Sequence, residues 1–339
     1  DLAAANSAAP DFVFPFRNLD FDVFEWATKQ SSHWKPKYYL ALLLKDRNKV
    51  AQSKAIFTSL QGEPDYAPFY ATRAALFMSE TTQSSILTAT IADLNKAIAL
   101  DKNQWRYIKT LTELYNTQFA FAKALEVVAP FYKAHTDNYI IGMLYAKTLI
   151  HNKQYTTADK LLASLNIIPF EGATIGHELY REAKLMQALV QLNEKNYTAA
   201  LNFINEAKLW PENLGAGKPY DDDIDIRTEN WLAYLCYKNL NNTKAANDML
   251  LAVVNFMPIR SNTISNFYAG NHLISLWAYA ALNQTSQGIE WIKKQQAKFP
   301  DNKIMQWASS SYQQKKIQPI AIQSEDATVR IIKQLGLSK

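Results

Sequence analysis

Cysteine is nearly absent from this chain, which has only Cys236 in 339 residues. The chain can therefore form no intrachain disulfide and no zinc site built from several cysteines. Aromatic and aliphatic residues flank Cys236 in the segment 231–237, a setting typical of a buried structural thiol. One cysteine does not fix the compartment, because a cytoplasmic protein and a disulfide-free periplasmic protein look alike in this respect.

Glycine is also scarce, with nine residues in the whole chain. Sandwiches and barrels need many tight turns, so this scarcity favours long helices joined by short loops. Hydrophobic residues make up 48% of the chain and charged residues 20%, which is enough apolar material for a continuous core and argues against disorder.

Strong charge and long apolar runs are missing as well. The formal net charge is +5, and no run rich in lysine and arginine stands out, so we expect no nucleic-acid partner. No stretch of 18 apolar residues occurs, so we expect no membrane span. The chain starts at Asp1 without an initiator methionine or a signal-type segment, so we expect either a removed leader or a piece of a longer protein.

What is present is a helical-repeat signature in the segment 93–104, Asp-Leu-Asn-Lys-Ala-Ile-Ala-Leu-Asp-Lys-Asn-Gln. The pattern is typical of the second helix and exit turn of a tetratricopeptide repeat. The small Ala97 would let one helix back closely onto its partner. Leu94, Ile98 and Leu100 would fill the seam between helix pairs.

Two near-identical turns support the repeat. Lys153-Gln154-Tyr155-Thr156-Thr157-Ala158 and Lys195-Asn196-Tyr197-Thr198-Ala199-Ala200 both match the turn between the two helices of such a unit. In this turn the tyrosine packs across the loop and the alanine permits close contact. The first four units follow the usual period of about 34 residues, and the later ones carry longer loops.

These patterns predict an all-α fold, a right-handed α-solenoid of about seven tetratricopeptide-like helix pairs with closing helices. The predicted pairs are 37–44 with 50–60, 66–80 with 84–100, 103–117 with 119–134, 138–151 with 154–165, 174–194 with 196–209, 222–240 with 243–257, and 267–282 with 285–298. Two further helices, 301–315 and 324–335, would close the array. We expect three parts: an extended lead-in over 1–19 whose apolar side chains lie on the first helices, a repeat array over 20–300, and closing helices over 301–339.

The extra length of the later repeats falls in two loops, 166–174 and 210–225. The second loop holds Gly215 and Gly217 and is rich in carboxylates. Loops on one face of an array often carry binding groups. A structural explanation is equally open: the glycines let the chain turn, and Asp221 to Asp223 cap the next helix. The loop does not fit an EF-hand, since Ile226 takes the place of the glycine and Leu232 that of the bidentate glutamate.

Several of these segments, read together, carry a family resemblance. Residues 14–17, 34–41, 63–70, 103–106, 177–183 and 210–223 look like successive motifs of one bacterial group. The chain resembles the C-terminal tetratricopeptide region of a domain-of-unknown-function family whose N-terminal part is β-rich and mutarotase-like or glycosidase-like. The resemblance covers about residues 12 to 300 and implies the array fold, a missing N-terminal domain as partner, and carbohydrate as a ligand through that domain. It implies no catalytic residue.

The residue types and their spacing give little support for an enzyme. The five histidines show no metal-ligand spacing, and His177-Glu178 lacks the second histidine of a zinc helix. No Gly-x-Ser-x-Gly elbow occurs. Paired carboxylates for sugar hydrolysis could come from Glu171, Glu178, Glu212 or Asp221 to Asp223, but sequence does not give their separation. We expect no catalysis by this chain alone, and no cofactor or metal.

The prediction is instead a scaffold that mediates protein–protein or interdomain interaction. The alternative is that the loops 166–174 and 210–225 complete the active site of a carbohydrate-processing partner domain. On the inner face we expect aromatic residues and arginines, namely Tyr38, Tyr70, Trp105, Arg106, Tyr145, Tyr180, Arg181 and Trp231. The predicted binding residues are Trp105, Arg106, Glu171, Glu178, Arg181, Asn213, Lys218 and Asp221, and the last six should gather on one side beneath the two loops.

Overall fold

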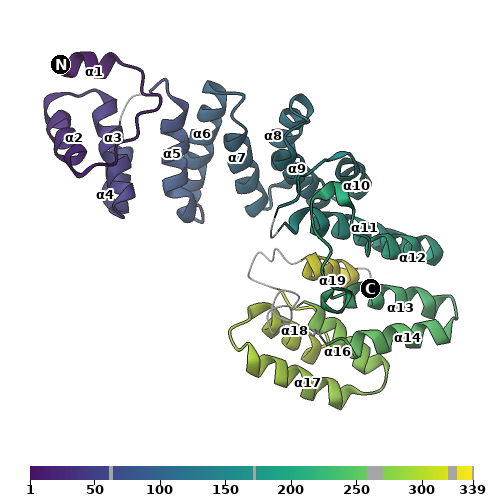
Figure 1. The fold of residues 1–339 in the computed structure, drawn as a ribbon. Coiled ribbons are helices and arrows are strands. Elements are labelled where there is room, and N and C mark those ends of the chain that lie inside the picture. The colour runs from purple at the N-terminus through teal and green to yellow at the C-terminus, as the bar shows by residue number, and fades with distance from the viewer. Residues whose placement is uncertain (61–63, 171–172, 258–269, 320–326, 338–339) are drawn as a thin grey trace. The chain divides into compact units, whose positions relative to one another are not determined.

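The computed structural model describes residues 1–60, 64–170, 173–257, 270–319 and 327–337. Every regular element within these ranges is a helix (Figure 1). The chain divides into two compact units, Asp1–Tyr115 and Asn116–Lys339, and each is described by itself. The predicted all-α class is confirmed, and within each unit the helices stack as successive antiparallel pairs.

Unit 1 is built from two helix pairs and their flanking helices. α3 packs on α4 and α5 packs on α6, while α2 packs on α3. The helices are α1 (Leu2–Ser7), α2 (Asn18–Gln30), α3 (Trp34–Asp46), α4 (Val50–Ser59), α5 (Ala67–Phe77), a 3-10 turn (Met78–Glu80), α6 (Ser84–Leu100) and α7 (Trp105–Thr117).

Unit 2 continues the same arrangement with α9 on α10, α11 on α12, α13 on α14 and α16 on α17. Its helices are α8 (Phe121–Ala134), α9 (Tyr139–His151), α10 (Tyr155–Ser164), α11 (Ile175–Asn193), α12 (Tyr197–Glu206), α13 (Arg227–Asn239), α14 (Thr243–Val254), α16 (Asn271–Ala281), α17 (Thr285–Lys298), α18 (Lys303–Gln313) and α19 (Ala327–Leu337). Most predicted bounds agree within a few residues. The largest difference is α13, which begins at Arg227 rather than at residue 222, because residues 221–223 form a separate 3-10 turn.

The turn inside most pairs has one recurring backbone feature. A residue other than glycine adopts a left-handed conformation two positions before the second helix of the pair begins. These residues and their φ angles are Asn48 (57°), Phe119 (55°), Lys153 (59°), Lys195 (63°), Asn241 (58°) and Asn283 (60°). Glycine is the usual residue there, because it has no Cβ penalty. The scarcity of glycine therefore does not mean that tight turns are absent; lysine and asparagine make them.

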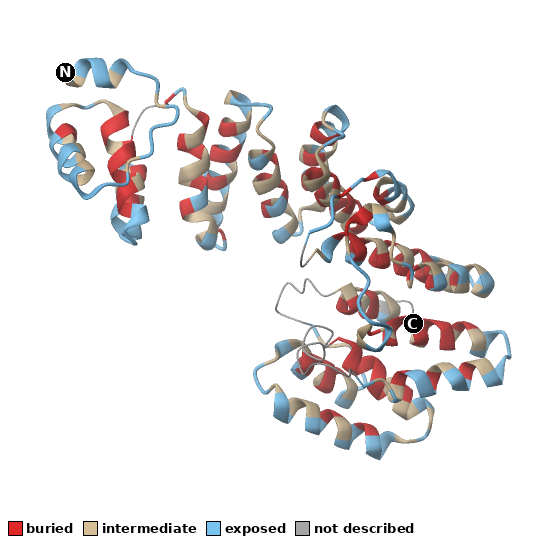
Figure 2. Ribbon diagram, viewed as in Figure 1, coloured by how far each residue is buried: buried red, intermediate tan, exposed pale blue. Residues whose placement is uncertain are grey.

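Aromatic rings dominate the core of unit 1. Tyr38 lies among Tyr39, Phe57 and Phe69, with ring centroids 5.6 to 6.0 Å from its own. Burial raises the pKa of the Tyr38 phenol well above its ordinary value of 10, and a hydrogen bond with Thr72 opposes this only in part. Ala97 of the repeat signature has no exposed surface and joins the same cluster, as the predicted close helix contact requires. Figure 2 shows how buried positions alternate with exposed ones along the helices.

The lead-in differs from its prediction. Leu2–Ser7 is helical, and Lys35 of α3 donates to the carbonyl of Asn6 at 2.7 Å, which ties this segment to the unit. The apolar side chains that follow do not lie on the first helices: Phe12 is 91% exposed, Phe14 74% and Phe16 67%. The prolines and a tight turn at Phe12 hold these rings outward, so the expectation for the apolar side chains of 1–19 is wrong.

Small and aliphatic residues dominate the core of unit 2. Alanines at 188, 200, 207 and 233 let α11, α12 and α13 approach closely. The closing helices are not a simple end cap. α18 packs on α16, and α19 returns to α11, where Ile331 enters the α11–α13 cluster and Val329 and Ile332 enter the next one.

Candidate functional site

Unit 2 contains a partly open cavity of about 1450 Å³, which we call the tryptophan groove. It lies among α13, α16, α17, α18, the segment after α18, and α19. Its described lining residues are Trp231, Leu235, Leu273, Trp277, Ala280, Thr285, Ile289, Ile292, Lys293, Ser309, Ser311, Tyr312, Gln313, Lys315, Lys316, Ile317, Gln318, Pro319, Lys333, Leu335 and Gly336.

Two tryptophans on successive first helices form one wall of the groove. The ring centroids of Trp231 on α13 and Trp277 on α16 are 5.6 Å apart at an angle of 37°. Both rings are half-buried, since each also packs against the core cluster of Tyr234, Leu273 and their neighbours. Such rings offer a rigid apolar surface whose ordering cost has already been met by the fold. Of the predicted inner-face aromatics, Trp231 thus lines an open cavity, whereas Tyr38 and Tyr70 are buried in the core of unit 1.

Lysines provide the charge of the groove. Lys293 comes from α17, Lys315 and Lys316 follow α18, and Lys333 lies on α19, while no aspartate or glutamate is found among the described lining residues. Burial, and then the positive charge of the nearby Arg330, lower the pKa of Lys333. The groove is therefore apolar in its depth and cationic around it.

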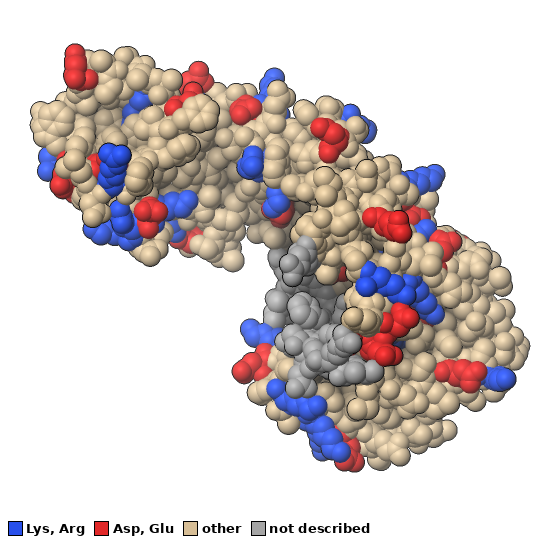
Figure 3. All heavy atoms as spheres, in the orientation of Figure 1, with Lys and Arg blue, Asp and Glu red and all other residues tan. Residues whose placement is uncertain are grey.

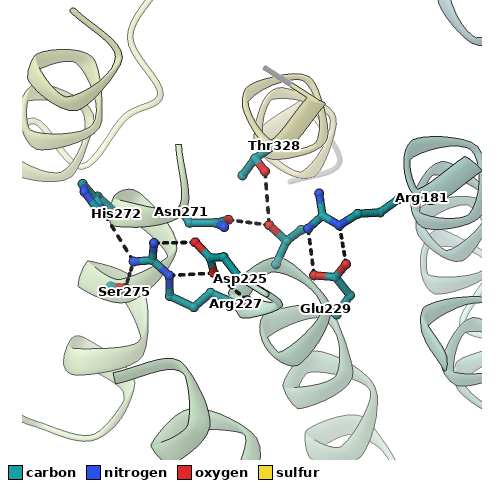
Figure 4. A network of polar contacts seen from close by, with 9 residues as sticks. Arg181, Asp225, Arg227, Glu229, Asn271, His272, Ser275 and Thr328 are labelled. Atoms are coloured by element: carbon teal, nitrogen blue, oxygen red, sulfur yellow. Dashed lines mark hydrogen bonds and ion pairs between the residues drawn. The ribbon is translucent and has the colours of Figure 1, made fainter. Parts of the chain in front are cut away.

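A buried polar network holds the helices that form the groove (Figure 4). Arg227 at the start of α13 pairs with Asp225, with Nη2 2.6 Å from Oδ2. Its Nη1 reaches Ser275 Oγ at 3.0 Å and His272 Nδ1 at 3.2 Å on α16. Burial raises the pKa of Asp225, but the charge and hydrogen bonds of Arg227 outweigh it and leave that pKa below its usual range. Burial, and then Arg227, lower the pKa of His272 to about 3, so His272 stays neutral.

The same network reaches α11 and α19. Arg181 forms a bidentate ion pair with Glu229, at 2.5 and 2.8 Å, and both side chains are almost fully buried. Arg330 forms a second bidentate pair with Glu182, with both distances 2.6 Å. Removing one member of such a pair leaves an uncompensated buried charge, so these contacts fix α11, α13 and α19 in one register.

Arg181 was predicted as a binding residue, and the structure places its guanidinium in this buried pair instead of on an open surface. Sequence reasoning missed the network because its partners are far apart in the chain. Only Asp225 and Arg227 are close in sequence, and the acidic loop drew attention to Asp221–Asp223 instead.

The two long loops contact each other. The backbone N–H of Ile167 donates to the carbonyl of Asn213 at 2.8 Å, and a Cβ added to Gly215 would lie 2.8 Å from the carbonyl oxygen of Ile167. Asn213 donates its side-chain amide to the carbonyls of Leu162 and Leu165, at 3.0 and 2.9 Å. It thereby satisfies carbonyls at the end of α10, which is a structural role.

The remaining predicted residues of this region do not converge on one point. Glu178 is exposed in the first turn of α11, where its charge complements the helix dipole. Lys218 and Asp221 form an exposed ion pair with each other at 2.7 Å. Glu171 lies outside the described residues. The structural interpretation of Asp221 to Asp223 as the cap of the next helix is wrong, since Asp225 accepts from the N–H of Arg227 where α13 begins.

A stacked pair beside these loops went unpredicted. The His177 and Trp210 rings are parallel within 7°, with centroids 3.4 Å apart. Burial and the charge of Arg181 lower the pKa of His177, a hydrogen bond with Leu209 partly opposes this, and the result is about 4. Among the residues that the structure describes, none forms a hydrogen bond with the buried His177 Nε2. His177 therefore acts as a neutral packing residue at neutral pH.

Trp105 and Arg106 belong to unit 1. The guanidinium of Arg106 lies over the Trp105 ring at 4.6 Å, and its Nη1 donates to Gln104 at 3.3 Å. This exposed cation–π pair is typical of surface residues. A role for either residue in binding stays a prediction.

The described residues give little support for a metal site or for an activated nucleophile. No group of three or more histidine, cysteine, aspartate or glutamate side chains there could hold a metal ion. Burial raises the pKa of the Cys236 thiol to about 11, so it is not a thiolate near neutral pH.

On the face shown in Figure 3, acidic and basic side chains are scattered rather than gathered into a basic stripe. No helix within the described ranges combines the length and the hydrophobicity that a membrane span requires.

Comparisons with known proteins give only distant likenesses. No family model matches the sequence, and no curated protein matches it. Among solved structures, the Naa15/Naa10 complex bound to HypK-THB gives a TM-score of 0.47 at 14% identity and covers 84% of this chain. PilF of Pseudomonas aeruginosa gives 0.36 at 16% identity over 70% of this chain, and the APC/C hetero-tetramer Cut9–Hcn1 gives 0.37 at 10% over 86%.

The matches cover 40% of the first of these chains, 96% of the second and 52% of the third. At such identities and TM-scores they say nothing about what this chain binds. The fold description rests on the helices and their packing within each unit.

Proposed function

We propose that this chain is a tetratricopeptide-like repeat module that binds another protein, and that the tryptophan groove is its binding surface. The observation that carries the proposal is the groove itself, an apolar cavity of about 1450 Å³ open to solvent within a packed helical array. Half-buried tryptophans are common anchors of protein interfaces. Exposed apolar surface of this kind marks an interaction site more often than it is tolerated without purpose.

The surrounding structure supports a scaffold more than a catalyst. Oppositely charged groups in the interior of unit 2 pair with one another: Asp225 with Arg227, Arg181 with Glu229, and Glu182 with Arg330. They stabilise the positions of the helices and do not face the groove. The alternative, in which the two long loops complete a carbohydrate-processing site, gains no support, because the contacts of Asn213 and Gly215 serve to join the loops.

The proposal includes a partner carried on the same polypeptide. Unit 1 exposes an apolar stripe on α2, where Leu19, Val23 and Trp26 are 69%, 49% and 55% exposed and share one helix face. Together with the outward rings of Phe14 and Phe16, this stripe suits contact with a neighbouring domain. Limited proteolysis of the natural full-length polypeptide would test this. A Trp26→Asp substitution should release such a domain, and unchanged cleavage would contradict the interdomain part.

The test of the groove uses two matched surface substitutions. Ile289 lines the groove on α17 and is 39% exposed, whereas Leu251 on α14 is 45% exposed and lies outside it. Both side chains are aliphatic, on second helices of unit 2, and replacing either by asparagine leaves the core intact. Proteins captured from an extract by the unmodified chain should be lost with Ile289→Asn and retained with Leu251→Asn, as quantified by mass spectrometry. Equal capture by both variants would overturn the assignment of the groove.

A further inference from the structure

The described side chains that line the tryptophan groove include four lysines and no carboxylate. Some other lysines of unit 2 have acidic partners: Lys184 pairs with Asp159 and Glu206, and Lys294 with Glu290. Within the described ranges, none of the four groove lysines forms an ion pair. The contrast is clearest on α17, where Lys293 borders the groove and the next residue, Lys294, pairs with Glu290 of the same helix.

The size of the groove favours a peptide over a small molecule. Small-molecule pockets usually hold about 300–1000 Å³, and this cavity is larger. A helix about 10 Å across fills 1450 Å³ over roughly 18 Å, which corresponds to about twelve residues at 1.5 Å per residue. About three turns are enough to present apolar side chains at i, i+3, i+4 and i+7 to the tryptophan wall.

We infer that the tryptophan groove binds an acidic amphipathic helix of a partner protein, with the apolar face against Trp231 and Trp277 and carboxylates beside Lys293, Lys315, Lys316 and Lys333. This inference rests on the proposed function and specifies the chemistry of the partner. The apolar face replaces solvent on the half-buried rings. The flanking carboxylates supply acidic groups that the described lining residues do not contain, and they fix which way the helix lies.

Position matters because the lysines come from different elements. Lys293 belongs to α17, Lys315 and Lys316 to the segment after α18, and Lys333 to α19. A helix with carboxylates on both flanks of its apolar stripe can therefore meet basic groups from more than one element. Charges at the edge of an interface act mainly on the rate of association and on specificity, so binding should weaken as salt increases.

The experiment measures fluorescence anisotropy of a labelled peptide of about twelve residues, with leucine at i, i+3, i+4 and i+7 and glutamate on both flanks. Its two control peptides replace every glutamate by glutamine or by lysine. The acidic peptide should bind, and its Kd should rise with salt. We expect Lys293→Glu to raise the Kd about fivefold, and the Lys315→Glu/Lys316→Glu double variant to raise it about tenfold.

Lys294→Glu is the matched control, because it reverses a charge one residue away that does not line the groove, and it should leave the Kd unchanged. Equal binding of the glutamine peptide would overturn the acidic chemistry. So would oleate displacing the peptide when added at equal concentration, since a long-chain carboxylate would then be the preferred occupant. If no peptide binds while capture of natural partners still depends on Ile289, the acidic helix is wrong and the proposed function stands. If capture does not depend on Ile289, the proposed function fails first.

Discussion

The two units pack their helices together with different kinds of residue. Unit 1 joins its helix pairs through a cluster of rings around Tyr38 and Phe69, with Arg73 and Asp93 as its bidentate ion pair at 2.6 and 2.8 Å. Unit 2 uses alanines and aliphatic residues for close approach and adds the Arg181–Glu229, Arg227–Asp225 and Arg330–Glu182 pairs at its helix junctions. Truncating one of the interlocked rings leaves a cavity that a second substitution does not fill. Removing one buried charge leaves its partner uncompensated, and removing that partner as well can restore stability.

Phe69→Ala should cause the largest loss of stability of the substitutions considered, and no second substitution should restore it. Phe69 is fully buried and contacts four other rings, so truncation leaves a cavity and should reduce the free energy of unfolding of unit 1 by about 3–5 kcal/mol. Hydrogen exchange with mass spectrometry measures each unit separately. Protection of backbone amides from exchange should fall in unit 1 only. An equal fall in unit 2 would contradict the description of two units with separate cores.

Glu229→Ala should cost a similar amount in unit 2, about 3–5 kcal/mol, because it leaves Arg181 buried without its partner. Here, however, a second substitution should help. Replacing both residues, as Arg181→Met with Glu229→Leu, removes the charges together and should restore most of the stability in urea denaturation. If the double variant remains as unstable as Glu229→Ala, the ion pair stabilises unit 2 by more than is needed to offset the cost of burying its two charges.

Acidification should act on unit 2 before unit 1. The pKa of His177 is about 4 in the folded chain and 6.5 when exposed, so the unfolded chain takes up a proton as the pH falls below 6.5 and the folded chain does not until near 4. Stability is thus complete above pH 6.5 and is lost as the pH falls toward 4, by about 2 kcal/mol at pH 4.5. His177→Phe keeps a ring against Trp210 and should remove that part of the loss between urea midpoints at pH 7 and pH 4.5. An identical pH dependence in the variant would show that His177 does not titrate as described.

Gly215→Ala should weaken the contact between the two long loops by about 1–2 kcal/mol. Gly215 has a φ of 68°, and its added Cβ would lie against the Ile167 carbonyl. Gly217→Ala is the control, since nothing lies within 4 Å of a Cβ there. Thermal unfolding should separate the two variants. Equal Tm values would mean that the loops contribute little to the stability of unit 2.

Lys195→Gly should have the smallest effect and the opposite sign. Its φ of 63° is strained for lysine and natural for glycine, so the substitution should stabilise unit 2 by about 0.5–1 kcal/mol. Asn241→Gly should gain less, because asparagine tolerates this conformation better. Urea midpoints of the two variants provide the measurement, and destabilisation by Lys195→Gly would show that its side chain contributes to the turn.

The sequence predicts the helices well and the site poorly, for one physical reason. Helix bounds and helix pairing are local, so the period of apolar residues and turns such as Lys153 to Ala158 identify them. The groove and the polar network join residues that are far apart: Arg227 with His272, and Glu182 with Arg330. Of the groove residues, only Trp231 could be proposed in advance, because an aromatic residue in a repeat helix is a common interface anchor. Trp277 and the groove lysines look like ordinary members of amphipathic helices until the fold brings them together.

The left-handed turn residues have one further consequence. A glycine would leave nothing beyond the backbone at the bend between two helices, whereas Lys153, Lys195, Asn241 and Asn283 each carry a polar side chain there. At these bends a small energetic strain therefore provides positions that can change charge or contact preference without disturbing the interior.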